Sequence, residues 1–301
     1  MIISDKQILD LNISSEQKLK WVDECLRHKS EYDLPAKISI KKDNGIFYNT
    51  MPAVMEPLDI AGVKLVNRYI DRVPALDAKI LLYKYSTGLL DAILDGNEIT
   101  AMRTGAVAVH SARLFAVKDF SVVSMIGLGN IMIHTADVLF DIYKDRQLTV
   151  KLFNFADEGK RFMNRYCDYK NVNFVLCDSY EETFSDSDLI FSAVSYIDGD
   201  FCDESVYKKG CTVIPIHTRG FMQCDLSFDK VFGDDTAHLH DFKYFDKYKS
   251  FAEVADVISD RKPGRESDDE RILVYNIGLA IHDLYYSKRI IEMIKLSEAT
   301  I

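Results

Sequence analysis

Two glycines, Gly127 and Gly129, are the residues whose spacing points most directly to chemistry. The run before them, residues 121–126, is short, apolar and β-branched, which predicts a buried parallel strand, and an apolar segment compatible with a helix follows over residues 131–143. Glycines in such a turn let the backbone approach a pyrophosphate closely, while the new helix offers free N–H groups and its positive end. The pattern predicts nucleotide binding. An ordinary turn between strand and helix is the alternative, because Met132 occupies the place of the third small residue.

Two basic residues stand in surroundings that are apolar or small. Lys64 lies in the middle of a strand predicted over residues 61–67, and by alternation it faces away from its two apolar neighbours. A lysine that faces solvent is the alternative. Arg103 lies inside a helix predicted over residues 98–115, where small neighbours leave its guanidinium room to grip a carboxylate with two hydrogen bonds. A surface salt bridge is the alternative for this arginine.

Composition argues against several kinds of partner and site. The 301 residues carry 37 lysines and arginines against 47 acidic residues, a net charge of −10, so we expect no nucleic acid and no anionic membrane as a partner. Six cysteines form no CxxC pair, the start does not resemble a signal peptide, and no apolar run is long enough to span a membrane. These features predict a cytoplasmic protein. His238 and His240 lack a matched third ligand, so no metal is expected.

The elements that must position these residues fall into two groups. After residue 118 strands and helices alternate, which predicts an α/β domain with a Rossmann-type doubly wound parallel sheet and strands at 121–126, 149–153, 172–176, 188–194, 211–216 and 230–233. The first hundred residues predict a strand-rich α+β domain with strands at 37–42, 46–51, 61–67 and 80–85.

Caps and turns mark several boundaries of these elements. Ser14 or Ser15 can cap a first helix, Thr100 can cap the helix that carries Arg103, and Asp43-Asn44-Gly45 predicts a hairpin turn. Residues 272–296 predict one long apolar helix or two, which would pack on the first domain or on a second subunit.

Several motifs together resemble the ornithine cyclodeaminase/mu-crystallin family. They are Met51-Pro52, Gly62-Val-Lys64 with Asn67, the block Leu94-Asp-Gly-Asn-Glu-Ile-Thr-Ala-Met-Arg-Thr-Gly-Ala106, the strand that ends in Gly127-x-Gly129, and Asn276-Ile-Gly-Leu-Ala-Ile-His-Asp283. The Asp-Gly…Thr-Ala-x-Arg-Thr block is the most specific of them, and the resemblance covers nearly the whole chain.

The resemblance implies a two-domain homodimer. Residues 1–117 and 265–301 would form a discontinuous substrate-binding and dimerisation domain, and residues 118–264 a dinucleotide-binding Rossmann domain. It further implies NAD or NADP as the cofactor and a small amino or imino acid as the substrate, bound in the cleft.

The resemblance also implies roles for individual residues. Arg103 would hold the substrate carboxylate, together with Lys37, which stands where many members have an arginine. Met51 would contact the substrate, and Lys64 would move a proton near the reacting carbon. The residues expected at the cofactor are Thr104, Gly127, Gly129, Asn130, Ile131, Asn154, Ala193, Val194 and Arg219.

The chain departs from the family after the strand at 211–216. Ornithine cyclodeaminases have an acid there that takes part in proton transfer, whereas this chain has Thr218 or Arg219 at that position. His217 could replace the acid as a catalytic residue, since its reference pKa lies near neutrality, or it could be a strand-end histidine bonded to the backbone. Asn154 ends the second strand of the Rossmann domain and is neutral, so NAD or NADP remains open with a slight preference for NAD.

Three functions are compatible with these residues. The first is an NAD(P)-dependent oxidoreductase that exchanges hydride at the α carbon of a small amino or imino acid, with imine reduction as the reducing direction. The second is cyclodeamination of L-ornithine to L-proline and ammonia with recycled NAD. The third is a non-catalytic protein that binds the cofactor or a ligand.

Overall fold

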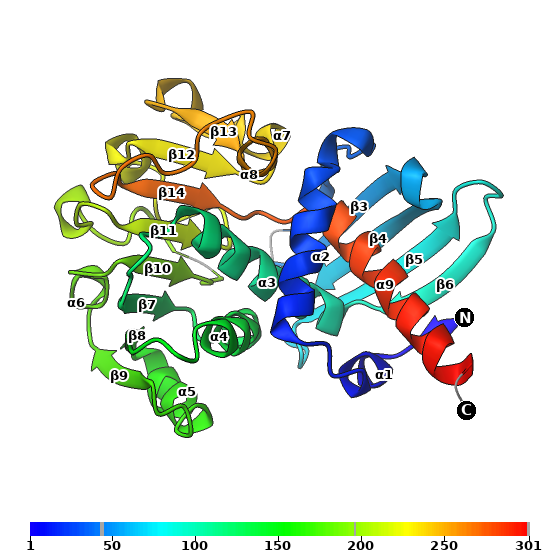
Figure 1. Ribbon diagram of the computed structural model, residues 1–301, viewed down its shortest axis with the longest axis horizontal. Coiled ribbons are helices and arrows are strands. Elements are labelled where there is room, and N and C mark those ends of the chain that lie inside the picture. Colours follow the sequence, from blue (N-terminus) through cyan, green and yellow to red (C-terminus); the bar gives the residue numbers. More distant parts are fainter. Residues whose placement is uncertain (43–44, 196, 300–301) are drawn as a thin grey trace. The chain divides into compact units, whose positions relative to one another are not determined.

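The computed structural model describes residues 1–42, 45–195 and 197–299 (Figure 1). The chain divides into two compact units, Met1–Arg103 with Leu279–Ile301, and Thr104–Gly278. The first division falls inside helix α3 (Asn97–Phe115). From the resemblance we expected the divisions at 117/118 and 264/265. Asp43 and Asn44 of the predicted hairpin turn lie outside the described residues.

A six-stranded sheet forms the frame of the first unit. Its order is β1-β6-β5-β4-β3-β2, and β1 runs parallel to β6 while every other pair is antiparallel. Long neighbouring strands joined by short connections produce this meander. The strands are β1 (Ile2–Ile3), β2 (Ile38–Lys41), β3 (Phe47–Met55), β4 (Ile60–Arg68), β5 (Leu76–Lys84) and β6 (Leu90–Asp95).

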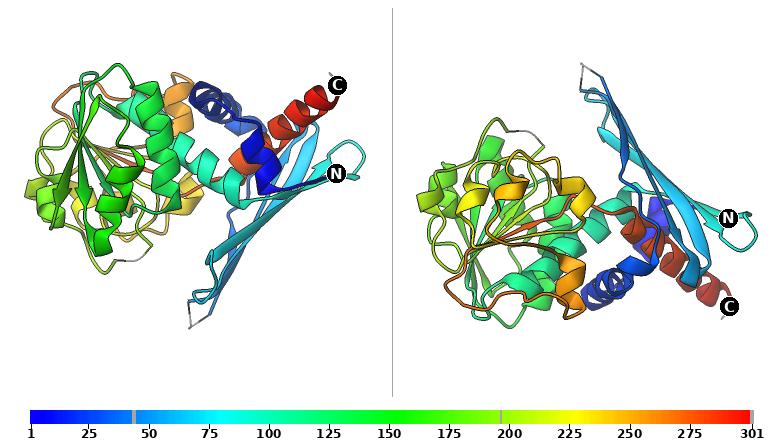
Figure 2. Two further views of the ribbon diagram at one scale, coloured as in Figure 1. Left: turned by 90° about the horizontal axis from the view of Figure 1, so that it is seen from below. Right: turned by 90° about the horizontal axis from the view of Figure 1, so that it is seen from above.

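Helices cover one face of this sheet. They are α1 (Asp5–Asp10), α2 (Ser15–Arg27) and α9 (Ala280–Ala299), with short 3₁₀ turns η1 (Lys29–Glu31) and η2 (Glu56–Leu58). Helix α9 packs on β3, β4 and β5, and α2 lies against α9 on the same side (Figure 2). Ser14 caps α2 by accepting a hydrogen bond from the backbone N–H of Gln17, which confirms one of the two predicted caps.

An eight-stranded sheet forms the frame of the second unit. All of its neighbouring strands are parallel, in the order β13-β12-β14-β11-β10-β7-β8-β9, as Figure 1 shows. The strands are β7 (Val122–Ile126), β8 (Leu148–Phe153), β9 (Val172–Cys177), β10 (Leu189–Ser192), β11 (Thr212–Pro215), β12 (Lys230–Gly233), β13 (Phe251–Glu253) and β14 (Ile272–Tyr275). The predicted doubly wound parallel sheet is therefore confirmed.

The helices of the second unit connect these strands. They are the second part of α3, then α4 (Asn130–Ile142), α5 (Glu158–Arg165), α6 (Tyr180–Phe184), α7 (Thr236–Leu239) and α8 (Val254–Ile258). Short 3₁₀ turns are η3 (Phe155–Asp157), η4 (Glu204–Val206), η5 (Cys224–Ser227) and η6 (Phe245–Lys247). The chain runs from β7 outward to β8 and β9 and then returns to β10 on the other side of β7, so β7 and β10 flank the point where strand order reverses.

Two sequence predictions were wrong. Residues 272–275 form strand β14 between β11 and β12, and the helix begins only at Ala280, because Gly278 adopts a φ of 98° that a helix does not allow. Thr100 lies inside α3, which begins at Asn97, so it is not the cap of that helix. No helix within the described residues is long and apolar enough to cross a membrane.

Candidate active site

Lys64 is buried in the first unit, with 2% of its surface exposed. Alternation along β4 turns Ile60, Gly62 and Lys64 to the side covered by α9, whereas Leu65 on the opposite side is 44% exposed. Gly62 permits the close approach of the helix, since a Cβ there would lie 2.9 Å from the Leu284 Cδ2 atom. The solvent-facing alternative for Lys64 was therefore wrong.

Lys64, Thr100, Arg103 and Asp283 form one cluster, which we call the Lys64 cluster. The Lys64 Nζ atom lies 3.0 and 2.9 Å from the two carboxylate oxygens of Asp283 and 3.3 Å from the Thr100 Oγ1 atom. The Arg103 Nε atom donates to the Asp283 Oδ1 atom at 3.0 Å. Lys64, Arg103 and Asp283 are all buried. Two cations thus share one carboxylate, which leaves a net charge of +1 inside the unit.

The charges of this cluster depend on one another. Burial alone would favour the neutral acid of Asp283, but Arg103 and Lys64 outweigh it and hold the pKa of this carboxyl below its usual value. Burial, with smaller contributions from Arg103 and Lys37, lowers the pKa of the Lys64 amine to about 8 against the opposing attraction of Asp283. A lysine whose pKa lies this close to neutrality can exchange a proton under ordinary conditions.

Arg103 contacts Asp283 through Nε, the inner nitrogen of its guanidinium. The planar guanidinium of an arginine matches the two oxygens of a carboxylate. Met51 pairs with Lys64 in the register of β3 and β4 and is also buried, so the structure brings Met51, Lys64 and Arg103 together in the first unit. Lys37 acts on Lys64 electrostatically.

Sequence reasoning quoted Asp283 only as the end of a motif and assigned it no role. A signal was present, because Asp283 is an acid at the start of a helix whose neighbours Leu279, Ala280, Ile281 and Leu284 are apolar. A charge that folding forces into an apolar interior needs an opposite charge nearby. The partner, however, lies 219 residues away in the sequence at Lys64, and only the fold identifies it.

The turn after β7 has the geometry that a dinucleotide requires. Gly127 adopts a φ of 72°, and a Cβ at this position would lie 2.5 Å from the carbonyl carbon of Ala193, just after β10. Gly129 is the N-cap residue of α4, so no side chain caps this helix. No atom of the described residues lies within 4 Å of the position that a Cβ of Gly129 would take. The N-terminus of a 13-residue helix therefore opens on free space, which fits a pyrophosphate group.

Met132 occupies the position where the usual pattern has a third small residue. Its side chain is fully buried in the second unit. The tight contact is made instead by Gly105 of α3, where a Cβ would lie 2.6 Å from the carbonyl carbon of His134 in α4. The small residue has moved from α4 to the helix that α4 packs against, and sequence reasoning missed Gly105.

Asn154 follows β8, at the edge where a ribose would be recognised. Its backbone N–H donates to the Cys177 carbonyl oxygen, and its Oδ1 atom is buried without a hydrogen bond to the described residues. Ala156 and Asp157 both adopt left-handed φ values, 47° and 59°, so the chain turns sharply before α5. Asp157 forms an ion pair with Lys160 at 2.8 Å.

Comparison with known proteins places these features in a family. The sequence pattern of the ornithine cyclodeaminase/mu-crystallin family matches residues 1–298. The chain belongs to this family. A relative from Rhizobium meliloti, the nodulation efficiency protein NfeD, is 23% identical over 97% of this chain and 94% of its own length.

Solved structures of the family share the fold. The Δ(1)-pyrroline-2-carboxylate reductase of Thermococcus litoralis, solved with NADH and L-proline, superposes with a TM-score of 0.86 at 21% identity and 97% coverage of each chain. An archaeal alanine dehydrogenase dimer with bound NAD superposes with a TM-score of 0.85 at 22% identity, with 99% of this chain and 97% of that chain covered.

The loop after β11 contains the departure from the cyclodeaminases of this family. His217 is held at both ring nitrogens, because Nε2 lies 2.6 Å from the Ser192 Oγ atom and Nδ1 accepts from the backbone N–H of Arg219 at 3.2 Å. Burial lowers the pKa of His217 to about 4, so it is neutral at neutral pH. These contacts are those of the strand-end histidine that was the alternative to a catalytic role.

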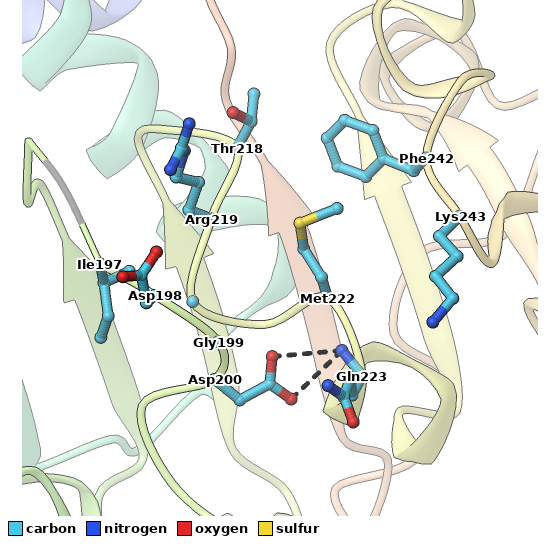
Figure 3. Close-up of a pocket in the computed structure, with 11 residues that line it drawn as sticks. Ile197, Asp198, Gly199, Asp200, Thr218, Arg219, Met222, Gln223, Phe242 and Lys243 are labelled. Atoms are coloured by element: carbon cyan, nitrogen blue, oxygen red, sulfur yellow. Dashed lines mark hydrogen bonds between the residues drawn. The ribbon is translucent and has the colours of Figure 1, made fainter.

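The same loop borders a pocket of about 440 Å³ at the carboxyl ends of β10 and β11 (Figure 3). Arg219 and Lys243 supply positive charge, and Asp200 is occupied by the backbone N–H groups of Gln223 and Cys224. The other lining residues are Ile197, Asp198, Gly199, Thr218, Gly220, Met222 and Phe242.

The remaining predicted cofactor residues lie at the same edge of the larger sheet or on helix α3. Ala193 and Val194 follow β10 and contact the Gly127 turn, Asn130 and Ile131 begin α4, and Thr104 is buried on α3. Among the described residues, no three His, Cys, Asp or Glu side chains gather as a metal site. The His238 Nδ1 atom lies 4.0 Å from the Asp234 Oδ1 atom.

Proposed function

We propose that this protein is an NAD(P)-dependent oxidoreductase that transfers a hydride at the α carbon of a small amino or imino acid. The observation that supports this most directly is the Lys64 cluster, in which two buried cations share a single carboxylate. A net positive, buried site favours an anion, and a planar fork favours a carboxylate. The substrate acid group would supply the missing negative charge.

Each residue of the cluster has a distinct part in this proposal. Arg103 binds the substrate carboxylate through its terminal nitrogens, and Lys37 adds attraction for the same group. Met51 contacts the body of the substrate. Lys64 exchanges a proton with the substrate nitrogen, which its pKa of about 8 permits. A pyrroline-2-carboxylate reductase and an alanine dehydrogenase share the fold, and both names describe chemistry beside a carboxylate.

The cofactor would bind along the carboxyl edge of β7 and β10. When bound, it supplies or accepts the hydride. Gly127 and Gly129 let the backbone approach its pyrophosphate, and the α4 N-terminus donates hydrogen bonds to it. Asn130, Ile131, Ala193, Val194, Thr104 and Arg219 remain proposed contacts. We infer a preference for NAD, since Asn154, which follows β8 where the ribose would be recognised, is neutral rather than basic.

Steady-state kinetics with purified protein tests the proposal. The substrates are Δ1-pyrroline-2-carboxylate and pyruvate with ammonium in the reducing direction, and L-proline and L-alanine in the oxidising direction, each with both cofactors. Arg103→Lys keeps the charge but loses the fork, so KM for the active substrate should rise ~10-fold to 200-fold, as expected for loss of a charge-assisted hydrogen bond. Arg113→Lys, at an exposed arginine on the same helix, should leave KM unchanged.

Two results would contradict the proposal. One is the absence of NADH and NADPH binding in calorimetry, which would leave the glycine turn without its ligand. The other is production of proline and ammonia from L-ornithine without net NADH, which would identify a cyclodeaminase. The second outcome is disfavoured because Thr218 or Arg219 stands where those enzymes have an acid.

We also propose that the chain forms a homodimer through the face of the six-stranded sheet that lies opposite α9. This face exposes Ile38, Ile40, Tyr48 and Leu65, and beside them is an apolar groove of about 400 Å³ lined by Pro52, Val54, Ala61, Val63 and neighbouring residues. An exposed apolar surface of this kind marks an interaction site. A solved structure with this fold is described as a dimer. Sedimentation should give a dimer for the wild type and a monomer for Leu65→Asp, whereas Leu296→Asp, at an exposed position on α9, should remain dimeric.

A further inference from the structure

Three acceptor atoms surround the amino group of Lys64. Two are the carboxylate oxygens of Asp283, at 3.0 and 2.9 Å, and the third is the Thr100 Oγ1 atom at 3.3 Å. Thr100 gives its own hydroxyl proton to the Gly96 carbonyl oxygen at 2.5 Å, so towards Lys64 it can only accept. No group of the described chain donates a hydrogen bond to the Lys64 Nζ atom.

This arrangement specifies a protonation state. An ammonium has three N–H donors and no acceptor, which matches three acceptor atoms, whereas a neutral amine has only two donors and a lone pair that would point at an oxygen. The charged groups that face Lys64 are Asp283 on α9, Arg103 on α3 and Lys37 ahead of β2, and Asp283 also acts on the Cys25 thiol of α2. Burial raises the pKa of the Cys25 thiol well above its usual value, so it remains neutral.

We propose that Thr100 and Asp283 are positioning residues that hold Lys64 as an ammonium, the protonation state that imine reduction requires. This inference rests on the proposed function and adds to it the residues that set the protonation state of Lys64. Asp283 supplies the opposite charge, while Thr100 supplies the third acceptor and aims one N–H bond away from the carboxylate.

The proton-donating step balances as follows for an imino acid. The N–H bond of Lys64 that faces Thr100, its longest contact at 3.3 Å, breaks, and the proton joins the imine nitrogen, whose lone pair forms the new N–H bond. The hydride supplied by the reduced nicotinamide forms the new C–H bond at the α carbon, and the C=N π pair becomes the nitrogen lone pair. Imine, NAD(P)H and one proton give amine and NAD(P)⁺, and solvent returns the proton to Lys64. Oxidation of an amine needs the opposite state, a neutral Lys64 that accepts a proton.

The pH dependence of kcat/KM provides the test. Imine reduction should fall as pH rises through the pKa of Lys64, and amine oxidation should rise through the same pKa, which lies near 8. Thr100→Val removes one acceptor from a charged donor and should move both limbs about one pH unit lower, with KM for the substrate carboxylate unchanged. Thr100→Ser should restore the wild-type limb. Thr87→Val, at an exposed loop position of the same unit, is the matched control and should shift nothing.

A titration that needs no turnover separates this inference from the proposed function. The ¹³Cε resonance of Lys64, assigned with Lys64→Met, should titrate near pH 8 in the wild type and about one unit lower in Thr100→Val. If no imino acid is reduced yet these shifts appear, the proposed function fails while the positioning role stands. A resonance that reports a neutral Lys64 at pH 7, or a Thr100→Val variant that loses stability without moving any limb, overturns the inference.

Discussion

Substitution by alanine should affect stability at Gly127 and cofactor affinity at Gly129, the two glycines of the turn after β7. Gly127→Ala places a methyl group on a residue with a φ of 72°, which costs about 1–2 kcal/mol for an L-residue. The new Cβ would also lie 2.5 Å from the carbonyl carbon of Ala193 and 2.6 Å from the Val194 nitrogen, both backbone atoms that cannot swing aside. Overpacking of this kind adds about 1–3 kcal/mol. We therefore expect Gly127→Ala to lower the free energy of unfolding by about 2–5 kcal/mol.

Gly129→Ala tests the ligand rather than the fold. Its φ of −80° suits any residue, and nothing in the described structure lies within 4 Å of the added methyl group. The loss of an N-cap glycine costs no more than about 1 kcal/mol. The methyl group would, however, occupy the space into which the α4 N–H groups point, so affinity for NADH or NADPH should fall at least ~10-fold, which corresponds to about 1.4 kcal/mol.

Urea denaturation and calorimetry with both cofactors measure the two effects on the same samples. The Gly127→Ala protein should be destabilised, whereas the Gly129→Ala protein should be stable but bind cofactor weakly. Unchanged stability of Gly127→Ala would refute the strained turn against Ala193. Unchanged cofactor affinity of Gly129→Ala would refute the placement of the pyrophosphate at the start of α4.

Three further predictions concern residues that support the second unit. Arg265 donates five hydrogen bonds, to four carbonyl oxygens and the Thr212 hydroxyl, so Arg265→Lys should cost about 2–4 kcal/mol in urea denaturation. Burial raises the pKa of Asp225 to about 6, so the folded state keeps a proton that the unfolded chain releases above about pH 4. Stability should therefore fall as pH rises from about 4 to 6, and Asp225→Asn should remove this pH dependence of stability. Burial lowers the pKa of His217 to about 4, so on acidification the unfolded chain binds a proton before the folded protein does, and stability should fall as pH drops from about 6.5 to 4. His217→Gln should remove this pH dependence of stability. If His217→Gln shifts the pH profile of kcat/KM, His217 has a catalytic role.

Regular patterns along the chain predicted six of the eight strands of the larger sheet. Each of its central strands is a short apolar run between turn residues, and every predicted strand from 121 to 233 is present within a few residues. Strands β13 and β14 were not predicted. Residues 272–275 are as apolar as the helix that follows them, and periodicity does not separate a four-residue buried strand from a helix. Residues 272–275 form a strand because they fill the position between β11 and β12 in the sheet.

The sequence alone indicated the family to which the chain belongs and singled out Lys64, Arg103, Gly127 and Gly129 as candidate site residues, because both depend on local spacing and motif. It did not reveal that Lys64 is buried, since a strand pattern is symmetric until a helix covers one of its faces. Nor did it reveal that Asp283 and Thr100 meet the lysine amino group, or that Gly105 takes over the tight contact next to α4. Those facts join residues up to 219 positions apart, and only packing brings such residues within hydrogen-bond distance and fixes which of them carry charge.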